Sequence, residues 1–264
     1  MTFDLATIWG GLLAFSIFAY VVLDGFDLGV GILFPFFPDR GDRDRIMSSL
    51  APVWDGNETW LVMGGGALLA AFPLAYAILM PALYLPILVM LLALVLRGVA
   101  FEFRVRGSER TRPLWEGGFV GGSLVATLCQ GVALAAFIDG VPVAGRAYAG
   151  GAFGWATPFA ALVALSLVAG YALLGACWLI WRTVGALRER AARLARPLAV
   201  ATLAAIALIS LLTPFVDPAL WSRWFSWPNI VLLAPVPVLV GVLFVGLTRS
   251  LARDRDAHPF LYAL

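Results

Sequence analysis

The sequence predicts an all-α fold, a polytopic bundle of about seven transmembrane helices. Its composition, its apolar runs and its arginine distribution support this prediction. Hydrophobic residues make up 62% of the 264 residues, charged residues make up only 13%, and the mean hydropathy is +0.93. Such values are typical of polytopic membrane proteins and exclude a soluble domain of this length. The formal net charge of +2 is too small to indicate a nucleic-acid partner.

Apolar runs of about 20 residues, the length that crosses roughly 30 Å of hydrocarbon, define the expected spans. The first runs from about Leu5 to Leu23 with an apolar extension to Phe37, and it is too long and too polar at its end for a signal peptide. The charge-free run from Thr59 to Leu96 is long enough for two crossings, and its prolines offer places to turn. Four further spans are expected, from Gly117 to Ile138, Pro158 to Trp181, Leu198 to Val216 and Ile230 to Leu247.

The basic residues predict the orientation of these spans. There are 18 of them, all arginine, and most follow the first, third, fifth and seventh spans. Cytoplasmic segments near span ends carry an excess of positive charge. The N-terminus is therefore predicted to lie outside, on the periplasmic side of a cytoplasmic membrane.

Two short motifs place carboxylates in or beside the spans. These are LDGFDLGVG, from Leu23, and WDGNETWL, from Trp54. Each motif has two acids three residues apart, which puts both on one face of a helix. With the predicted orientation, both pairs lie near the cytoplasmic face, and the third span returns there with further charges. The residues concerned are Asp24, Asp27, Asp55, Glu58, Arg97, Glu102 and Arg104.

Charged groups inside a membrane are costly, so these acids are candidate functional residues. Closely spaced acids in a low dielectric can hold a proton near neutral pH, which predicts a hydrated inlet that passes protons from the cytoplasm toward a redox or transport site. The structural alternative is that Arg97 and Arg104 neutralise the acids in ion pairs that fix helix packing. The remaining acids near this face are predicted to be solvated loop charges, namely Asp39, Asp42, Asp44 and Glu109.

Two tryptophans flank the second acidic pair, and a single histidine limits the redox chemistry. Trp54 and Trp60 are candidates to line a path, with interface anchoring as the alternative. Haem iron in a helix bundle usually takes His or Met ligands from facing helices, and His258 stands alone near the C-terminus. Cys129 and Cys177 lie in apolar runs without metal-ligand spacing. The chain is expected to bind no metal and to carry no redox centre alone.

Four motifs in the first hundred residues resemble subunit II of the cytochrome bd family of quinol oxidases. They are VLDGFDLGVG from Val22, SLAPVWDGNETWL from Ser49, GGGALLAAFP from Gly64 and LRGVAFEFR from Leu96. Their order and spacing are specific to that family. From Trp115 onward the resemblance depends on the number of spans and the arginine-rich segments.

The resemblance implies a haem-free partner of a larger subunit I, which binds two b-type haems and one d-type haem, oxidises quinol and reduces dioxygen to water. By motif match Asp55 is the proton-path acid, Trp60 lines an oxygen route, and Asp24, Asp27 and Glu58 support the inlet. A further set is assigned to structure or charge balance, namely Arg97, Glu102 and Arg104. The expected partners are subunit I and membrane lipid; a bound quinone and small accessory subunits stay open.

The resemblance also predicts how the chain is divided. Such subunits have two four-helix bundles plus one extra helix, so residues 1–140 are expected to form the first bundle and residues 141–264 the second. The second bundle is expected to be incomplete, because His258 and Pro259 open an eighth span just before the sequence stops.

Two other functions stay open at this level. One is a proton-coupled secondary transporter, because carboxylates in broken helices also form ion sites in such proteins. The acids lie near one face, whereas transporter sites lie at the bilayer midplane, which favours the oxidase subunit. The other is a purely structural assembly subunit, which would not conduct protons.

Overall fold

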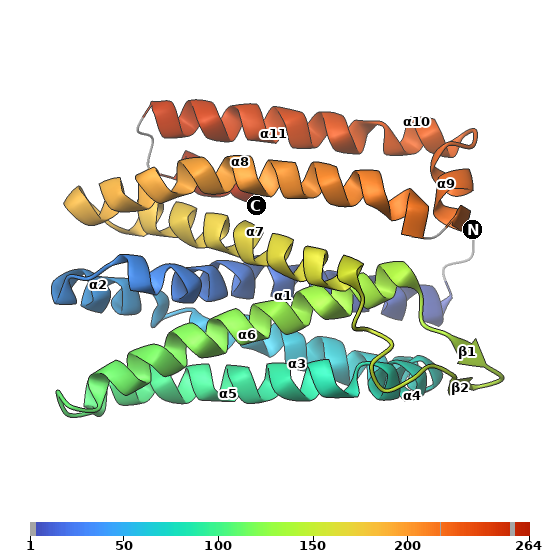
Figure 1. Ribbon diagram of the computed structural model, residues 1–264, viewed down its shortest axis with the longest axis horizontal. Helices are drawn as coiled ribbons and strands as arrows, with labels where there is room; N and C mark the ends of the chain where they lie inside the picture. The colour runs from blue at the N-terminus through green and yellow to red at the C-terminus, as the bar shows by residue number, and fades with distance from the viewer. Residues whose placement is uncertain (1–3, 217, 254–256) are drawn as a thin grey trace.

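The computed structural model describes residues 4–216, 218–253 and 257–264, and it is a bundle of long helices lying side by side (Figure 1). Within these residues six helical segments are long and apolar enough to cross a membrane. A seventh crossing is made by two shorter helices in series, so the predicted all-α bundle of about seven spans is confirmed. The six segments are Leu5–Phe36, Tyr84–Arg106, Arg112–Asp139, Pro158–Arg182, Gly185–Val216 and Asn229–Ala252.

The first span is one uninterrupted helix. Helix α1 (Leu5–Leu33) begins after Asp4, whose Oδ1 accepts from the Thr7 backbone N–H at 2.8 Å. It continues through the predicted extension and ends in a 3₁₀ turn, η1 (Phe34–Phe36). The arginine-rich segment that follows was expected to be a loop and is instead helix α2 (Arg40–Leu50). Its start is fixed by Asp39, which accepts from a backbone N–H of the first turn.

The predicted double crossing is also present. Helix α3 (Trp54–Ala71) stops at Phe72, because the next residue is a proline, and helix α4 (Pro73–Ala82) completes the span. The chain turns at Leu83 into α5 (Tyr84–Arg106). Helix α3 begins five residues earlier than the apolar run from Thr59, so both acids of the second motif are helical.

The remaining elements follow in sequence order. A two-strand antiparallel hairpin interrupts the otherwise helical chain, and its turn uses Gly145 at a positive φ of 62°. The segment from Arg188 to Arg196, expected to be a loop, is the first part of α8, which continues through Pro197. The elements are α6 (Arg112–Asp139), β1 (Val143–Ala144), β2 (Ala147–Tyr148), α7 (Pro158–Arg182), α8 (Gly185–Val216), α9 (Pro218–Trp224), α10 (Asn229–Leu233), α11 (Pro235–Ala252) and α12 (His258–Ala263).

The arginine-rich segments gather at one end of the bundle. In Figure 1, α2, the α5–α6 turn, the α7–α8 turn and the C-terminal end of α11 lie at the left, and the hairpin and α9 lie at the right with the start of α1. This arrangement agrees with the alternation of arginines along the sequence. By the positive-inside rule the left end is cytoplasmic.

Helix α1 packs closely against α7 through glycines. A Cβ added at Gly29 would lie 1.7 Å from the Tyr171 carbonyl oxygen, and one added at Gly175 would lie 2.4 Å from the Gly29 carbonyl carbon. Small residues allow such close approach between membrane helices. Nearby, the Phe26 ring stacks on Trp178 with 4.2 Å between ring centroids. The halves 1–140 and 141–264 therefore share a core, and the predicted division at residue 140 stays a prediction.

Candidate functional site: a buried carboxylate cluster

The acidic motifs and the third long span meet inside the bundle. We call this group the carboxylate cluster: Asp24 and Asp27 of α1, Asn57 and Glu58 of α3, and Arg97 of α5. Arg97 Nη1 donates to Glu58 Oε1 at 2.7 Å and lies 3.7 Å from Asp24 Oδ1. The side chains of Asp24 and Arg97 are each 1% exposed. Three helices therefore bring together four of the seven ionisable residues that were expected near this face, Asp24, Asp27, Glu58 and Arg97.

Asn57 was not singled out from the sequence, and it joins the two motifs. Its Nδ2 donates to Asp27 Oδ2 at 2.6 Å and to the Leu23 carbonyl oxygen at 3.2 Å. An amide lying between Asp55 and Glu58 in a helix that spans lipid was the available signal, because a buried amide needs partners. Asn57 thereby ties α3 to α1.

Several buried atoms of the cluster lack partners within the described part of the chain. Both carboxylate oxygens of Asp24, Asp27 Oδ1, and the Nε and Nη2 of Arg97 have no hydrogen bond of standard geometry. Buried polar groups are normally satisfied by protein or by ordered water. The cluster therefore has hydrogen-bonding capacity that this chain alone does not fill.

Asp55 lies apart from these buried groups. It occupies the first turn of α3, where the helix dipole favours a negative charge, and it is exposed on the surface of the chain. Glu58 follows one turn later and is partly buried. The second motif therefore has one acid at the surface and one in the cluster.

The two candidate tryptophans have different surroundings. Trp54 packs against Phe101 with ring centroids 5.2 Å apart, and its ring would be 3.3 Å from a Cβ added at Gly98. Trp60 meets Phe15 of α1 edge-on, with ring centroids 5.6 Å apart. Both tryptophans are half-buried on the same helix as Asp55.

Arg104 does not neutralise the motif acids, and Glu102 lies outside the carboxylate cluster. Arg104 belongs to a second group, the end cluster, which we define as Arg43, Asp44, Arg104, Arg112 and Glu116. Arg104 Nη1 donates to Asp44 Oδ1 at 2.8 Å, and its Nε donates to Glu116 Oε1 at 3.0 Å. Asp44 was expected to be a solvated loop charge, but it binds this buried guanidinium. Glu102 pairs only loosely with Arg106, at 3.4 Å.

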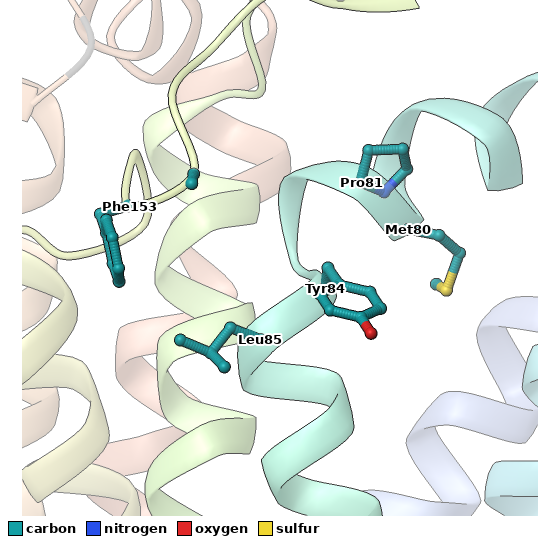
Figure 2. Close-up of a pocket in the computed structure, with 6 residues that line it drawn as sticks. Met80, Pro81, Tyr84, Leu85 and Phe153 are labelled. Carbon is teal, nitrogen blue, oxygen red and sulfur yellow. The ribbon is translucent and has the colours of Figure 1, made fainter.

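A hollow near the opposite end of the bundle is unrelated to these charges. It has a volume of about 530 Å³ and lies between the α4–α5 turn and the loop before α7. In Figure 2, Phe153 faces Leu85 and Tyr84 across it. Its lining is apolar except for the Tyr84 hydroxyl, so it carries no acid–base chemistry. The lining residues are Met80, Pro81, Tyr84, Leu85, Ala152 and Phe153.

No group of three or more His, Cys, Asp or Glu side chains in residues 4–216, 218–253 and 257–264 is arranged to hold a metal ion. His258 is exposed at the start of α12 and lies near Tyr262, with 6.5 Å between ring centroids.

The fold and the cluster define a class: a helical integral membrane protein with ionisable side chains buried inside its bilayer-spanning part. The family described as "Cytochrome bd terminal oxidase subunit II" matches residues 5–264. The chain belongs to this family and is a protein of the cytoplasmic membrane, as the resemblance predicted.

Relatives and a solved structure agree with this assignment. The chain is 38% identical over 208 residues to "Cytochrome bd-I ubiquinol oxidase subunit 2" of Escherichia coli strain K12, covering 76% of this chain and 55% of that protein. It is 36% identical over 142 residues to "Cytochrome bd ubiquinol oxidase subunit 2" of Bacillus subtilis strain 168, covering 53% and 42%. The chain spans about half the length of these relatives.

The fold is also that of a solved structure. The chain resembles bd oxidase from Geobacillus thermodenitrificans with a TM-score of 0.76 and 22% identity, covering 98% of this chain and 80% of that one. At this identity the likeness concerns the fold.

Proposed function

We propose that this chain is the haem-free second subunit of a cytochrome bd-type quinol oxidase. In this proposal a haem-bearing subunit I, with haems b and d, oxidises quinol and reduces dioxygen to water. The chain itself binds neither haem and provides access routes. The observation that carries the proposal is the carboxylate cluster, where three buried or partly buried carboxylates surround one guanidinium near the arginine-rich end.

The excess of carboxylates fits a group that takes up protons. One guanidinium balances one negative charge, and an uncompensated charge in low dielectric is costly, so the remaining acids are stabilised by binding protons. Reduction of dioxygen to water consumes protons as well as electrons. A cluster that exchanges protons near the cytoplasmic face would serve that demand.

The positions of the acids support an order along the route. Asp55 is exposed at the start of α3, Glu58 lies one turn further on, and Arg97 connects Glu58 to Asp24. We assign Asp55 to the entrance and the cluster to the inner part. Trp54 and Trp60, half-buried beside Asp55, are assigned to the lining of an oxygen path.

A proton-coupled secondary transporter is supported less well. Transporter sites are built where a helix is broken near the midplane, with backbone groups facing the ion. Here the break at Phe72 lies 14 residues after Glu58, about 21 Å along a helix at 1.5 Å per residue. The acids and the break therefore do not form one site.

The test is quinol-driven oxygen uptake by membranes that contain this chain together with subunit I. Asp55→Asn and Asp24→Asn are compared with Asp42→Asn, a control at the same end of the molecule whose carboxylate pairs with the exposed Arg45. We expect a several-fold loss of uptake in the first two variants, with unchanged haem spectra. Haem spectra report assembly independently of turnover.

The alternative outcomes are equally clear. Normal uptake in both variants would mean that the acids serve packing, as in a purely structural assembly subunit. Absence of haem spectra with the native chain would exclude the proposed pairing with subunit I. Bound lipid, quinone and small accessory subunits belong to the same proposal, and mass spectrometry of the purified complex detects each.

A further inference from the structure

A series of hydrogen bonds links α7, α6 and α1 beside the carboxylate cluster. The Tyr171 hydroxyl donates to Gln130 Oε1 at 2.8 Å, and Gln130 Nε2 donates to the Tyr20 hydroxyl oxygen at 2.7 Å. Tyr20 is 4% exposed and Tyr171 is 2% exposed. These three polar side chains have no part in the function proposed above.

The direction of each bond follows from the chemistry of the groups. A carbonyl oxygen only accepts, so Tyr171 is the donor of the first bond, and an amide nitrogen only donates, so the Tyr20 oxygen accepts the second. The Tyr20 hydroxyl hydrogen is then free for another acceptor. All the donors therefore point the same way, from α7 toward α1.

The acceptor at the end of this series is Asp24. Tyr20 lies four residues before Asp24 on α1, which places the two side chains on one face and the Tyr20 hydroxyl beside that carboxylate. Unlike the other two contacts, this one is not a hydrogen bond of standard geometry, because neither Asp24 oxygen has such a bond within the described residues. The other ionisable groups near Asp24 come from α5, α3, α1 and α7, namely Arg97, Glu58, Asp27 and Tyr171.

A glycine makes room for this arrangement. A Cβ added at Gly25, next to Asp24, would lie 2.8 Å from Tyr171 Cε1. The Tyr171 ring therefore occupies the space that a side chain at position 25 would fill. This contact holds the ring against α1 while its hydroxyl reaches Gln130.

We propose that Tyr20, Gln130 and Tyr171 are positioning residues that stabilise the ionised form of Asp24 through donors in series. Each bond polarises the next, so the Tyr20 hydroxyl is a stronger donor than it would be alone. The series thereby sets how readily Asp24 takes up a proton. Because its members lie on α7, α6 and α1, protonation of Asp24 depends on how these three helices pack together. An effect of this series on enzyme turnover rests on the proposed function. The stabilisation of ionised Asp24 by the three residues does not depend on that function.

The test is infrared spectroscopy of the purified membrane complex, with the protonated-carboxyl band of Asp24 assigned by its loss in Asp24→Asn. Measurements are made at the pH where that band is half its maximum in the native protein. Tyr20→Phe should raise the ratio of protonated to ionised Asp24 several-fold, up to the roughly tenfold value of one full hydrogen bond to a charged group. Tyr84→Phe, the same change at an exposed position far from the cluster, should leave the ratio unchanged.

A double variant distinguishes a series from separate effects. Tyr171→Phe should raise the ratio by a smaller factor, and Tyr20→Phe with Tyr171→Phe should raise it no more than Tyr20→Phe alone, because Tyr171 acts through Tyr20. An unchanged ratio in Tyr20→Phe, or effects that multiply independently in the double variant, would overturn the proposal.

Oxygen uptake by the same preparations separates this inference from the proposed function. Full uptake in Asp24→Asn would contradict the proton-route assignment of Asp24. The infrared ratios would still decide whether the three positioning residues act on it.

Discussion

Two arginines on the same face of α5, Arg97 and Arg104, are equally buried and serve different groups. They are seven residues apart, about two helical turns, and their side chains are 1% and 2% exposed. Arg97 faces three carboxylates, of which Asp24 and Asp27 are almost fully buried. Arg104 faces two, and one of them, Asp44, is half-exposed.

The end cluster has more arginines than carboxylates, whereas the carboxylate cluster has more carboxylates than arginines. In the end cluster Arg43 and Arg104 both bind Glu116, and Arg112 approaches Asp44 at 3.7 Å. Arg43 and Arg104 also lie over the Phe34 ring. The three arginines there outnumber the two carboxylates, so each carboxylate has a countercharge. Under the proposed function, only the excess carboxylates of the carboxylate cluster hold protons, and the end cluster serves packing.

The largest effect is expected from Gly29→Ala, which would separate α1 from α7 beside the carboxylate cluster and within the main hydrophobic core. The added Cβ would meet the Tyr171 carbonyl at 1.7 Å, and a backbone atom cannot move aside as a flexible side chain can. We expect a loss of more than about 3 kcal/mol of stability, measured by thermal unfolding of the purified protein in detergent.

Gly65→Ala is the matched control. It makes the same change in α3, where no atom lies within 4 Å of the added Cβ, and it should not destabilise the protein. Equal losses in the two variants would contradict the close contact at Gly29.

The second effect tests the two arginines directly. Arg97→Leu leaves several buried carboxylates without a countercharge, and breaking a buried pair in this way costs about 3–5 kcal/mol. Arg104→Leu should lower stability less, by about 1–2 kcal/mol. Glu116 keeps its ion pair with Arg43, and Asp44 is half-exposed to solvent. Thermal unfolding of both variants gives the order, and the reverse order would show that the end cluster is the more costly to disrupt.

The sequence was sufficient for much of this fold because the bilayer imposes simple rules. Length and hydropathy located the spans, and arginine placement indicated which ends lie together. The errors lie where polarity suggested a loop, in α2 and the first part of α8. Those segments are helical because helix formation at the membrane surface does not require apolar residues on every face.

The carboxylate cluster could be predicted only in part. Motif spacing placed Asp24, Asp27 and Glu58 near Arg97, since helices that return to one face bring such groups to one level. The spacing could not predict that Arg104 binds Asp44, because the segment that carries Asp44 was expected to be a loop and is helix α2. Nor could it find Asn57, Tyr20, Gln130 or Tyr171, whose contacts depend on how α1, α3, α6 and α7 rotate about their axes.

The third effect compares neutral variants of one acid from each cluster. Glu116→Gln removes the charge that two arginines share and should cost about 2 kcal/mol, the value of a hydrogen bond to a charged group. Asp27→Asn keeps an acceptor for Asn57 and reduces the excess of carboxylates, so its stability should be unchanged or higher. Unfolding midpoints that fall equally in both variants would contradict the difference in charge balance.

The smallest effect is expected at the margin of the end cluster, where Arg40 pairs with Glu109. The two side chains are 62% and 69% exposed, so water screens the pair and competes for its hydrogen bonds. Arg40→Ala should change stability by less than about 0.5 kcal/mol, whereas Arg43→Ala, which removes contacts with Glu116 and the Phe37 carbonyl, should cost more. If Arg40→Ala lost as much stability as Arg43→Ala, the exposed Arg40–Glu109 pair would belong to the stabilising network, and burial would not determine which ion pairs stabilise the protein.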